Sequence, residues 1–201
     1  MKARKILVSL AALALVAAIS IGGTLAYLTS TQSVKNTFTV GNVNITLDEA
    51  KVNEYGDPVA DAPRVLGNEY KLIPGHTYTK DPTIHVGGLS ENCYLFVKVE
   101  NGLGDAESTI ATQMVNLGWK PVDDQAGVYA WYGKTTEGAM NATRAIVAAG
   151  ANVTVFNTFT FGSQADPALY GSAEIVVTAY AIQADGLADK TDAALWAEFN
   201  A

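Results

Sequence analysis

The stretch CYLFVKVE, residues 93–100, decides the fold class. Cys93, Leu95, Val97 and Val99 lie two residues apart, so in an extended chain their side chains share one face. This spacing is typical of a β-strand, because a helix would repeat its apolar face about every 3.6 residues. Cys93 is also the chain's only cysteine. We expect it to be a small buried hydrophobe, and the alternative is a reactive or intermolecular thiol.

The same alternation recurs along the chain and predicts further short strands. They are expected in 34–40, 43–47, 118–122, 128–134, 153–161 and 174–183, with two more around Pro74–Gly75 within 70–86. Residues 174–183, EIVVTAYAIQ, are apolar on both faces, which predicts a central strand covered from both sides. The polar stretch 48–69 contains several glycines and prolines and indicates a long surface loop.

Only two segments have a helical pattern. One is 105–118, where Ile110, Met114 and Leu117 share a helical face before a glycine; the other is 191–199, which begins with the capping residue Thr191. Strands outnumber helices and the turns are rich in glycine and proline. The sequence therefore predicts an all-β fold, an antiparallel β-sandwich of jelly-roll type with one or two short capping helices, over residues 42–201.

Residues 1–26 have the pattern of a cleaved secretory signal peptide. A basic start precedes an apolar run over 6–21, which is shorter than the roughly 20 residues that a membrane-spanning helix needs. Thr24 and Ala26 satisfy the small-x-small rule of signal peptidases, so we expect cleavage between Ala26 and Tyr27. An uncleaved N-terminal anchor is the alternative, and the membrane would be contacted only through the uncleaved signal.

The charge of the chain argues against nucleic acid as a partner. The full chain has a net charge of −7, and the expected signal peptide holds three basic residues and no acidic ones, so the remainder carries −10. Such a surface repels nucleic acid and anionic lipid and favours solubility.

The sequence contains no recognisable catalytic set, so we predict that the protein is not an enzyme. There is no HExxH zinc motif and no GxSxG nucleophile motif. The chain has two histidines, His76 and His85, which with a carboxylate are weak candidates for a metal site. No resident cofactor is expected, although the acidic loops offer carboxylates that suit calcium.

The N-terminal sequence GGTLAYLTSTQSVKNTFTVGNVNITLDE, residues 22–49, resembles the TasA/camelysin family of exported proteins. Their cleavage region is followed by a Thr-rich stretch, an Asn-Thr-Phe triplet and an alternating strand, and a Pro-Gly turn with a lysine comes later. The matching residues are Gly22, Gly23, Thr24, Ala26, Asn36, Thr37, Phe38, Gly41, Val43, Ile45, Pro74, Gly75 and Lys80. The strands at 92–101 and 177–186 also resemble those of the family.

The resemblance implies an exported subunit of an extracellular fibre, in a biofilm matrix or on the cell surface of a Gram-positive bacterium. Its partners would be other copies of itself, a dedicated signal peptidase of SipW type and an accessory anchor protein. Residues 27–41 would act as a donor strand that completes the sheet of the next subunit. The alternating Val34, Phe38 and Val40 would then fill positions in that neighbour's core.

Three alternatives remain open. Residues 34–48 could be the first strands of a monomer's own sandwich. Relatives in the camelysin branch imply a surface metallopeptidase, although this chain shows no zinc motif. A monomeric surface adhesin is the third alternative.

Overall fold

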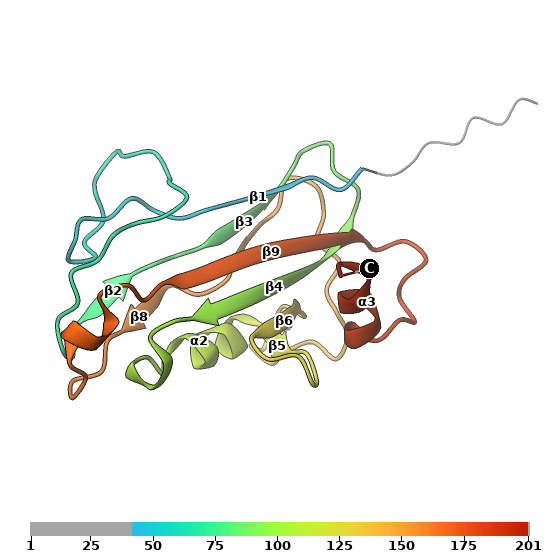
Figure 1. The fold of residues 1–201 in the computed structure, drawn as a ribbon. Helices are drawn as coiled ribbons and strands as arrows, with labels where there is room; N and C mark the ends of the chain where they lie inside the picture. Colours follow the sequence, from blue (N-terminus) through green and yellow to red (C-terminus); the bar gives the residue numbers. More distant parts are fainter. Residues whose placement is uncertain (1–41, 201) are drawn as a thin grey trace, which may run out of the picture. The chain divides into compact units, whose positions relative to one another are not determined.

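The computed structural model describes residues 42–200. The expected signal peptide (1–26) and donor segment (27–41) lie outside these residues. The described part is built from short antiparallel strands in two layers, with two short α-helices (Figure 1). This confirms the predicted all-β antiparallel sandwich with short helices. Within residues 42–200, no helix combines the length and apolar character needed to cross a membrane.

The first layer is formed by β1 (Ile45–Asp48), β3 (Thr83–Val86) and β7 (Asn152–Thr154), paired in that order. β2 (Thr77–Thr79), just before β3, and β8 (Thr158–Thr160), just after β7, form a second antiparallel pair. Backbone bonds between Lys80 N and Asn157 O and between Val155 N and Pro82 O connect the two pairs. The predicted strand at 153–161 is therefore split by a short break.

The second layer has the strand order β5 (Trp119–Pro121), β6 (Val128–Trp131), β4 (Cys93–Asn101) and β9 (Ile175–Gln183). Every pairing is antiparallel, and the β4–β9 ladder is the longest. The hairpin predicted between 118–122 and 128–134 is present as β5 and β6.

The main core lies between the two layers. It takes alternate residues of β4 together with apolar residues of the first layer, and its fully buried members include Tyr78, Ile84, Cys93, Leu95, Val97, Val155, Phe156 and Phe161. Trp119 is also buried there, and its indole Nε1 donates to Thr154 O at 3.0 Å, which connects the two layers.

The helices close the core and cover the outer face of the second layer. In α2 (Ile110–Leu117), Ile110 and Met114 enter the main core. In α3 (Asp192–Glu198), Leu195 and Trp196 pack on the opposite face of β4 in a second apolar cluster. A short 3₁₀ helix, η1 (Gly104–Ala106), precedes α2.

Glycine and threonine mark the ends of the helices as the sequence predicts. Gly118 ends α2 at φ 113°, a conformation that strains other residues, and a Cβ there would lie 2.7 Å from the backbone of Gly133. The Thr191 side chain accepts a hydrogen bond from Ala194 N at the start of α3.

Two strand predictions are wrong. β9 (Ile175–Gln183) is not central: in residues 42–200 it is the edge strand of its sheet, and β4 has the central place. An apolar strand can lie at an edge here because both of its faces are partly covered. Val177 packs on the main core, and Tyr180 packs on Trp196 of α3. Residues 70–73 form no strand either, so both strands of that region, β2 and β3, follow the Pro74–Gly75 turn.

Candidate functional site

The outer backbone edge of β9 is not paired with another strand of the described residues. At one end of the β4–β9 ladder Gly102 N donates to Glu174 O, and at the other Ala184 N donates to Asn92 O. Hydrogen-bonded pairs alternate in an antiparallel ladder, so the even-numbered residues of β9 bond to β4. The backbone N–H and C=O groups of the odd-numbered residues therefore point away from it; these residues are Ile175, Val177, Ala179, Ala181 and Gln183.

β1 has a similar edge. It pairs only with β3 among the described strands, and the bond from Gly87 N to Asn44 O sets the alternation. The backbone groups of Val43, Ile45 and Leu47 consequently point away from β3. β1 runs beside β9 with some Cα atoms within 8 Å (Figure 1), but no backbone ladder joins the two strands.

The side chains along these two edges point into the core but are incompletely covered. Ile45 and Leu47 of β1, and Ile175 and Val177 of β9, pack on the main core while remaining partly exposed. A β-sandwich is thus open along the seam between β1 and β9. Unpaired edges with apolar side chains are the usual template for an added strand.

The seam widens into a groove of about 1170 Å³ at the end where β1 stops and β9 begins. Its walls come from the end of β1, the loop 66–72, the 3₁₀ helix η2 (Pro167–Tyr170) and the start of β9. The buried side chains of Leu103 and Phe159 contribute apolar surface to it.

Tyr70 gives the groove wall a fixed aromatic surface. Its hydroxyl donates to Thr79 O at 3.0 Å, and its ring packs edge-on against Tyr78 and Phe159, with centroids 5.5 and 5.1 Å away. Burial is the main cause that raises the pKa of Tyr70, so the hydroxyl stays protonated at neutral pH. Tyr70 therefore contributes a neutral aromatic surface to a wall that also holds charged residues, among them Glu69 and Lys71.

Asn68 anchors the loop 66–72 to residues 49–52, which follow β1, through a network that includes a buried ion pair. Lys80 Nζ lies 2.6 Å from Glu49 Oε2, and both side chains are largely buried. Asn68 donates to Glu49 Oε1 at 2.9 Å and to Ala50 O at 2.8 Å, while Val52 N donates back to Asn68 Oδ1. This network holds one wall of the groove in place, because breaking it would leave the buried carboxylate of Glu49 unpaired.

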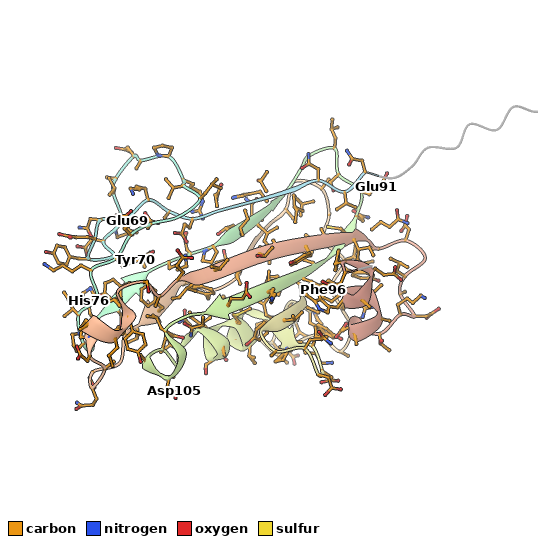
Figure 2. The ribbon with its side chains drawn as sticks, in the orientation of Figure 1. Glu69, Tyr70, His76, Glu91, Phe96 and Asp105 are labelled. Carbon is orange, nitrogen blue, oxygen red and sulfur yellow. The ribbon has the colours of Figure 1, made fainter. Side chains whose placement is uncertain are left out.

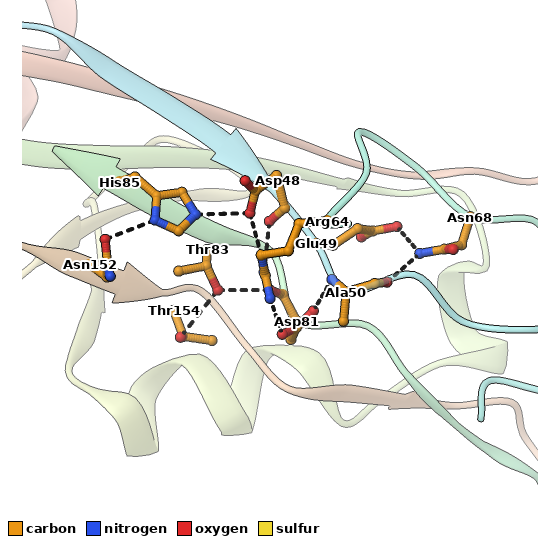
Figure 3. Close-up of polar contacts among 10 residues, drawn as sticks. All are labelled: Asp48, Glu49, Ala50, Arg64, Asn68, Asp81, Thr83, His85, Asn152 and Thr154. Carbon is orange, nitrogen blue, oxygen red and sulfur yellow. Dashed lines mark hydrogen bonds and ion pairs between the residues drawn. The ribbon is translucent and has the colours of Figure 1, made fainter. Parts of the chain in front are cut away.

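A second polar network crosses β1, β3 and β7 on the outer face of the first layer (Figure 3). His85 Nε2 lies 2.8 Å from Asp48 Oδ1, and His85 Nδ1 lies 2.8 Å from Asn152 Oδ1. Arg64 forms an ion pair with Asp48 and another with Asp81 at 2.9 Å. Each ring nitrogen of His85 thus faces an oxygen acceptor. The ring can donate to both acceptors only when both of its nitrogens carry protons, which is the charged imidazolium form.

The network shifts the protonation of its members. The hydrogen bond with Asp48 is the main cause that raises the pKa of His85. Burial alone would raise the pKa of Asp48, but the bonds from Arg64 and His85 outweigh it and lower that pKa. The imidazolium and the carboxylate thus stabilise each other.

The two histidines proposed as weak metal candidates have separate partners. His76 Nε2 lies 2.8 Å from Tyr55 O, and its ring packs against Tyr78, whereas His85 belongs to the network of Asp48. In residues 42–200, no three His, Cys, Asp or Glu residues gather in a group that could hold a metal ion. The described residues therefore add no support to the zinc or calcium alternatives.

Of the other residues singled out from the sequence, five precede the described range and one lies within it. Ala26, Tyr27, Val34, Phe38 and Val40 lie outside it. Cys93 lies inside, fully buried, and burial raises the pKa of its thiol to about 11. This confirms the expectation of a small buried hydrophobe.

The seam between β1 and β9 is what sequence reasoning missed. No local sequence pattern indicates this seam, because it depends on which strands of the folded domain pair with each other. No family model, curated protein or solved structure matches the chain.

Proposed function

We propose that the protein is an exported structural subunit of an extracellular fibre. Residues 27–41 of one copy would complete the open seam between β1 and β9 of the next copy. The observation that carries the proposal is the edge of β9 that pairs with no other strand of residues 42–200, whose outward backbone groups lie beside a groove with mixed polar and apolar walls. An extended segment added there gains backbone hydrogen bonds and buries side chains that are now half-covered.

The sequence of the segment suits this role. Val34, Phe38 and Val40 lie on one face of a strand, so they would point into the neighbour's core while the opposite face points outward. Lys35 is the only charged residue between Tyr27 and Val40. The segment therefore carries little charge to desolvate when it enters the groove.

Removal of the signal peptide after Ala26 frees this segment, and a signal peptidase of SipW type would make the cut. Before cleavage, the apolar run at 6–21 holds the segment at the membrane and delays assembly until export. An added strand joins two different surfaces, one on each copy, so the contact repeats without closing and produces a filament. An accessory anchor protein would attach the fibre to the cell.

Electron microscopy of two purified forms tests the proposal. One begins at Tyr27 and the other at Gly41, which leaves the described domain intact. Fibres from the first form and none from the second are expected. Fibres from both forms would remove the donor segment from the proposal, and folded monomers from both would overturn the fibre function.

The monomeric adhesin remains the second candidate, because the same groove could bind a foreign extended segment. A synthetic peptide of residues 27–41 distinguishes the two functions. A fibre subunit beginning at Gly41 should bind this peptide with one peptide per domain, as measured by calorimetry. An adhesin would not bind it.

A further inference from the structure

The two ends of the described domain differ in what they present. The exit end is the turn 87–91 together with Asn42, the first described residue. Glu91 N donates to Asn42 O at 3.0 Å and Asn44 N to Ser90 Oγ at 3.2 Å, so the turn is fixed beside the place where residues 27–41 join the domain. The groove end is the loop 66–72 with η2. Figure 2 shows Glu91 at one end and Glu69 and Tyr70 at the other.

The direction of an added strand decides which ends meet. β9 starts at the groove end, at Ile175, and stops near Asn92 at the exit end. A donor that runs antiparallel to β9 places its last residue, Val40, at the acceptor's groove end. A donor that runs parallel to β9 places Val40 at the exit end, where exit end meets exit end and two copies close into a reciprocal dimer. Only the antiparallel direction propagates a fibre.

The connection between donor and domain is too short to keep the two copies apart. Gly41 alone separates Val40 from Asn42. Two successive Cα–Cα steps span at most about 7.6 Å. A donor seated up to Val40 therefore brings its own exit end into direct contact with the groove end of the acceptor.

Both of these ends carry solvent-exposed apolar side chains. Leu89, in the turn of the exit end, is 98% exposed; Leu66 and Leu169, at the groove end, are 92% and 77% exposed. A single exposed leucine needs no explanation. Here the most exposed leucines of the described residues lie on the two surfaces that head-to-tail assembly would join.

We propose that the turn 87–91 of one copy docks on the groove end of the next, with Leu89 packing against Leu66 and Leu169. This inference rests on the proposed fibre function and adds a second contact to it. The donor strand supplies the covalent connection between subunits, and the end-to-end contact fixes the angle between them. The partner is a second copy of this chain.

The test uses the form that begins at Tyr27, with Leu89→Ser and a matched control, Val115→Ser. Val115 is 41% exposed on α2, away from both ends. We expect the critical concentration for assembly, measured by sedimentation, to rise about tenfold or more for Leu89→Ser. Val115→Ser should leave it unchanged. Equal critical concentrations for the two variants would overturn the end-to-end contact.

Two further measurements separate this inference from the donor strand. The Leu89→Ser domain beginning at Gly41 should bind the 27–41 peptide as the unmodified domain does, because the peptide has no turn 87–91. A peptide affinity that falls with Leu89→Ser would mean that the variant damages the groove, which would overturn the inference. If the unmodified Tyr27 form makes no fibres, the proposed function itself fails.

A charge pair offers a positive control. Leu89→Lys alone should block assembly, and the double variant Leu89→Lys with Leu66→Glu should restore it, since the new charges would face each other across the contact. A double variant that assembles no better than Leu89→Lys would place Leu66 outside the interface and contradict the proposed pairing.

Discussion

β4 and β9 are neighbouring strands of equal length and similar apolar character, but their surroundings differ. Both have nine residues, and both carry apolar side chains on each face. The first five residues of β4 are buried, because the first layer covers one face and α3 covers the other. All nine residues of β9 keep some exposure. The difference comes from position: among the strands of residues 42–200, β4 has a neighbour on each side and β9 has one only on the β4 side.

The comparison teaches that an apolar strand is not by itself a central strand. β9 has the composition of a strand with two neighbours, yet the described residues supply one. The mismatch between its composition and its surroundings is the physical reason for placing an incoming strand on its free edge.

The largest expected effect is a difference in how much the two strands contribute to the free energy of unfolding. Phe96 of β4 and Tyr180 of β9 are cross-strand partners, and both rings approach Trp196, with centroids 6.3 and 4.8 Å away. Phe96 is fully buried, so Phe96→Ala should lower the free energy of unfolding by about 3–5 kcal/mol. Tyr180→Ala should cost about half as much, because its ring already meets solvent.

Urea denaturation of the form beginning at Gly41 measures both changes. Tyr180→Ala is the matched control for Phe96→Ala, since it removes an aromatic ring from the same cluster. Equal losses of unfolding free energy for the two variants would show that the position of a strand has little influence on its contribution to stability.

Local signals in the sequence predicted a large part of the fold. Alternation located β4, a glycine in the left-handed region ended α2, and a threonine side chain capped α3. The order of strands was not readable in this way, because the pairing of Phe96 with Tyr180 joins residues far apart in the chain. The groove was also hidden, since its anchoring contact joins Glu49 to Lys80 across the long loop.

The second prediction tests the two sides of β9 with proline. Thr178 bonds to β4, so Thr178→Pro should break the ladder and cost about 1–3 kcal/mol of unfolding free energy. The Val177 N–H points away from β4, so Val177→Pro should cost under about 1 kcal/mol, as prolines on free strand edges do. In the Tyr27 form, however, Val177→Pro should abolish fibres while the monomer stays folded.

Circular dichroism and electron microscopy of the same samples measure these effects. The contrast between adjacent residues is the control, because both substitutions add the same ring to the same strand. Fibres of normal appearance from Val177→Pro would show that the outward edge of β9 accepts no strand. A loss of folding with Val177→Pro equal to that with Thr178→Pro would contradict the assignment of the free edge.

The smallest effect distinguishes β9 from the strand that faces it across the seam. β1 is fixed by charged groups, because His85 on β3 contacts Asp48, with Arg64 and Asp81 beside them. The pKa of His85 is raised on folding, so its contribution is fully present below the unfolded pKa of about 6.5 and is lost as pH rises through the folded value. The pKa of Asp48 is lowered, so its contribution is lost only in acid, as pH falls below about 4.

His85→Gln should therefore destabilise the domain most between about pH 4 and 6.5, and progressively less towards pH 8. The effect should stay under about 1 kcal/mol, because the pair is partly exposed and solvent screens it. Urea midpoints of the unmodified protein and the variant across this range measure the difference. A difference that grows towards pH 8 would mean that the neutral imidazole is the stabilising form.

Tyr180→Ala should show no such pH dependence, because the cluster around Trp196 that holds β9 against α3 is apolar and aromatic. The two edges of the seam would then respond to different conditions, with pH acting on the β1 side alone.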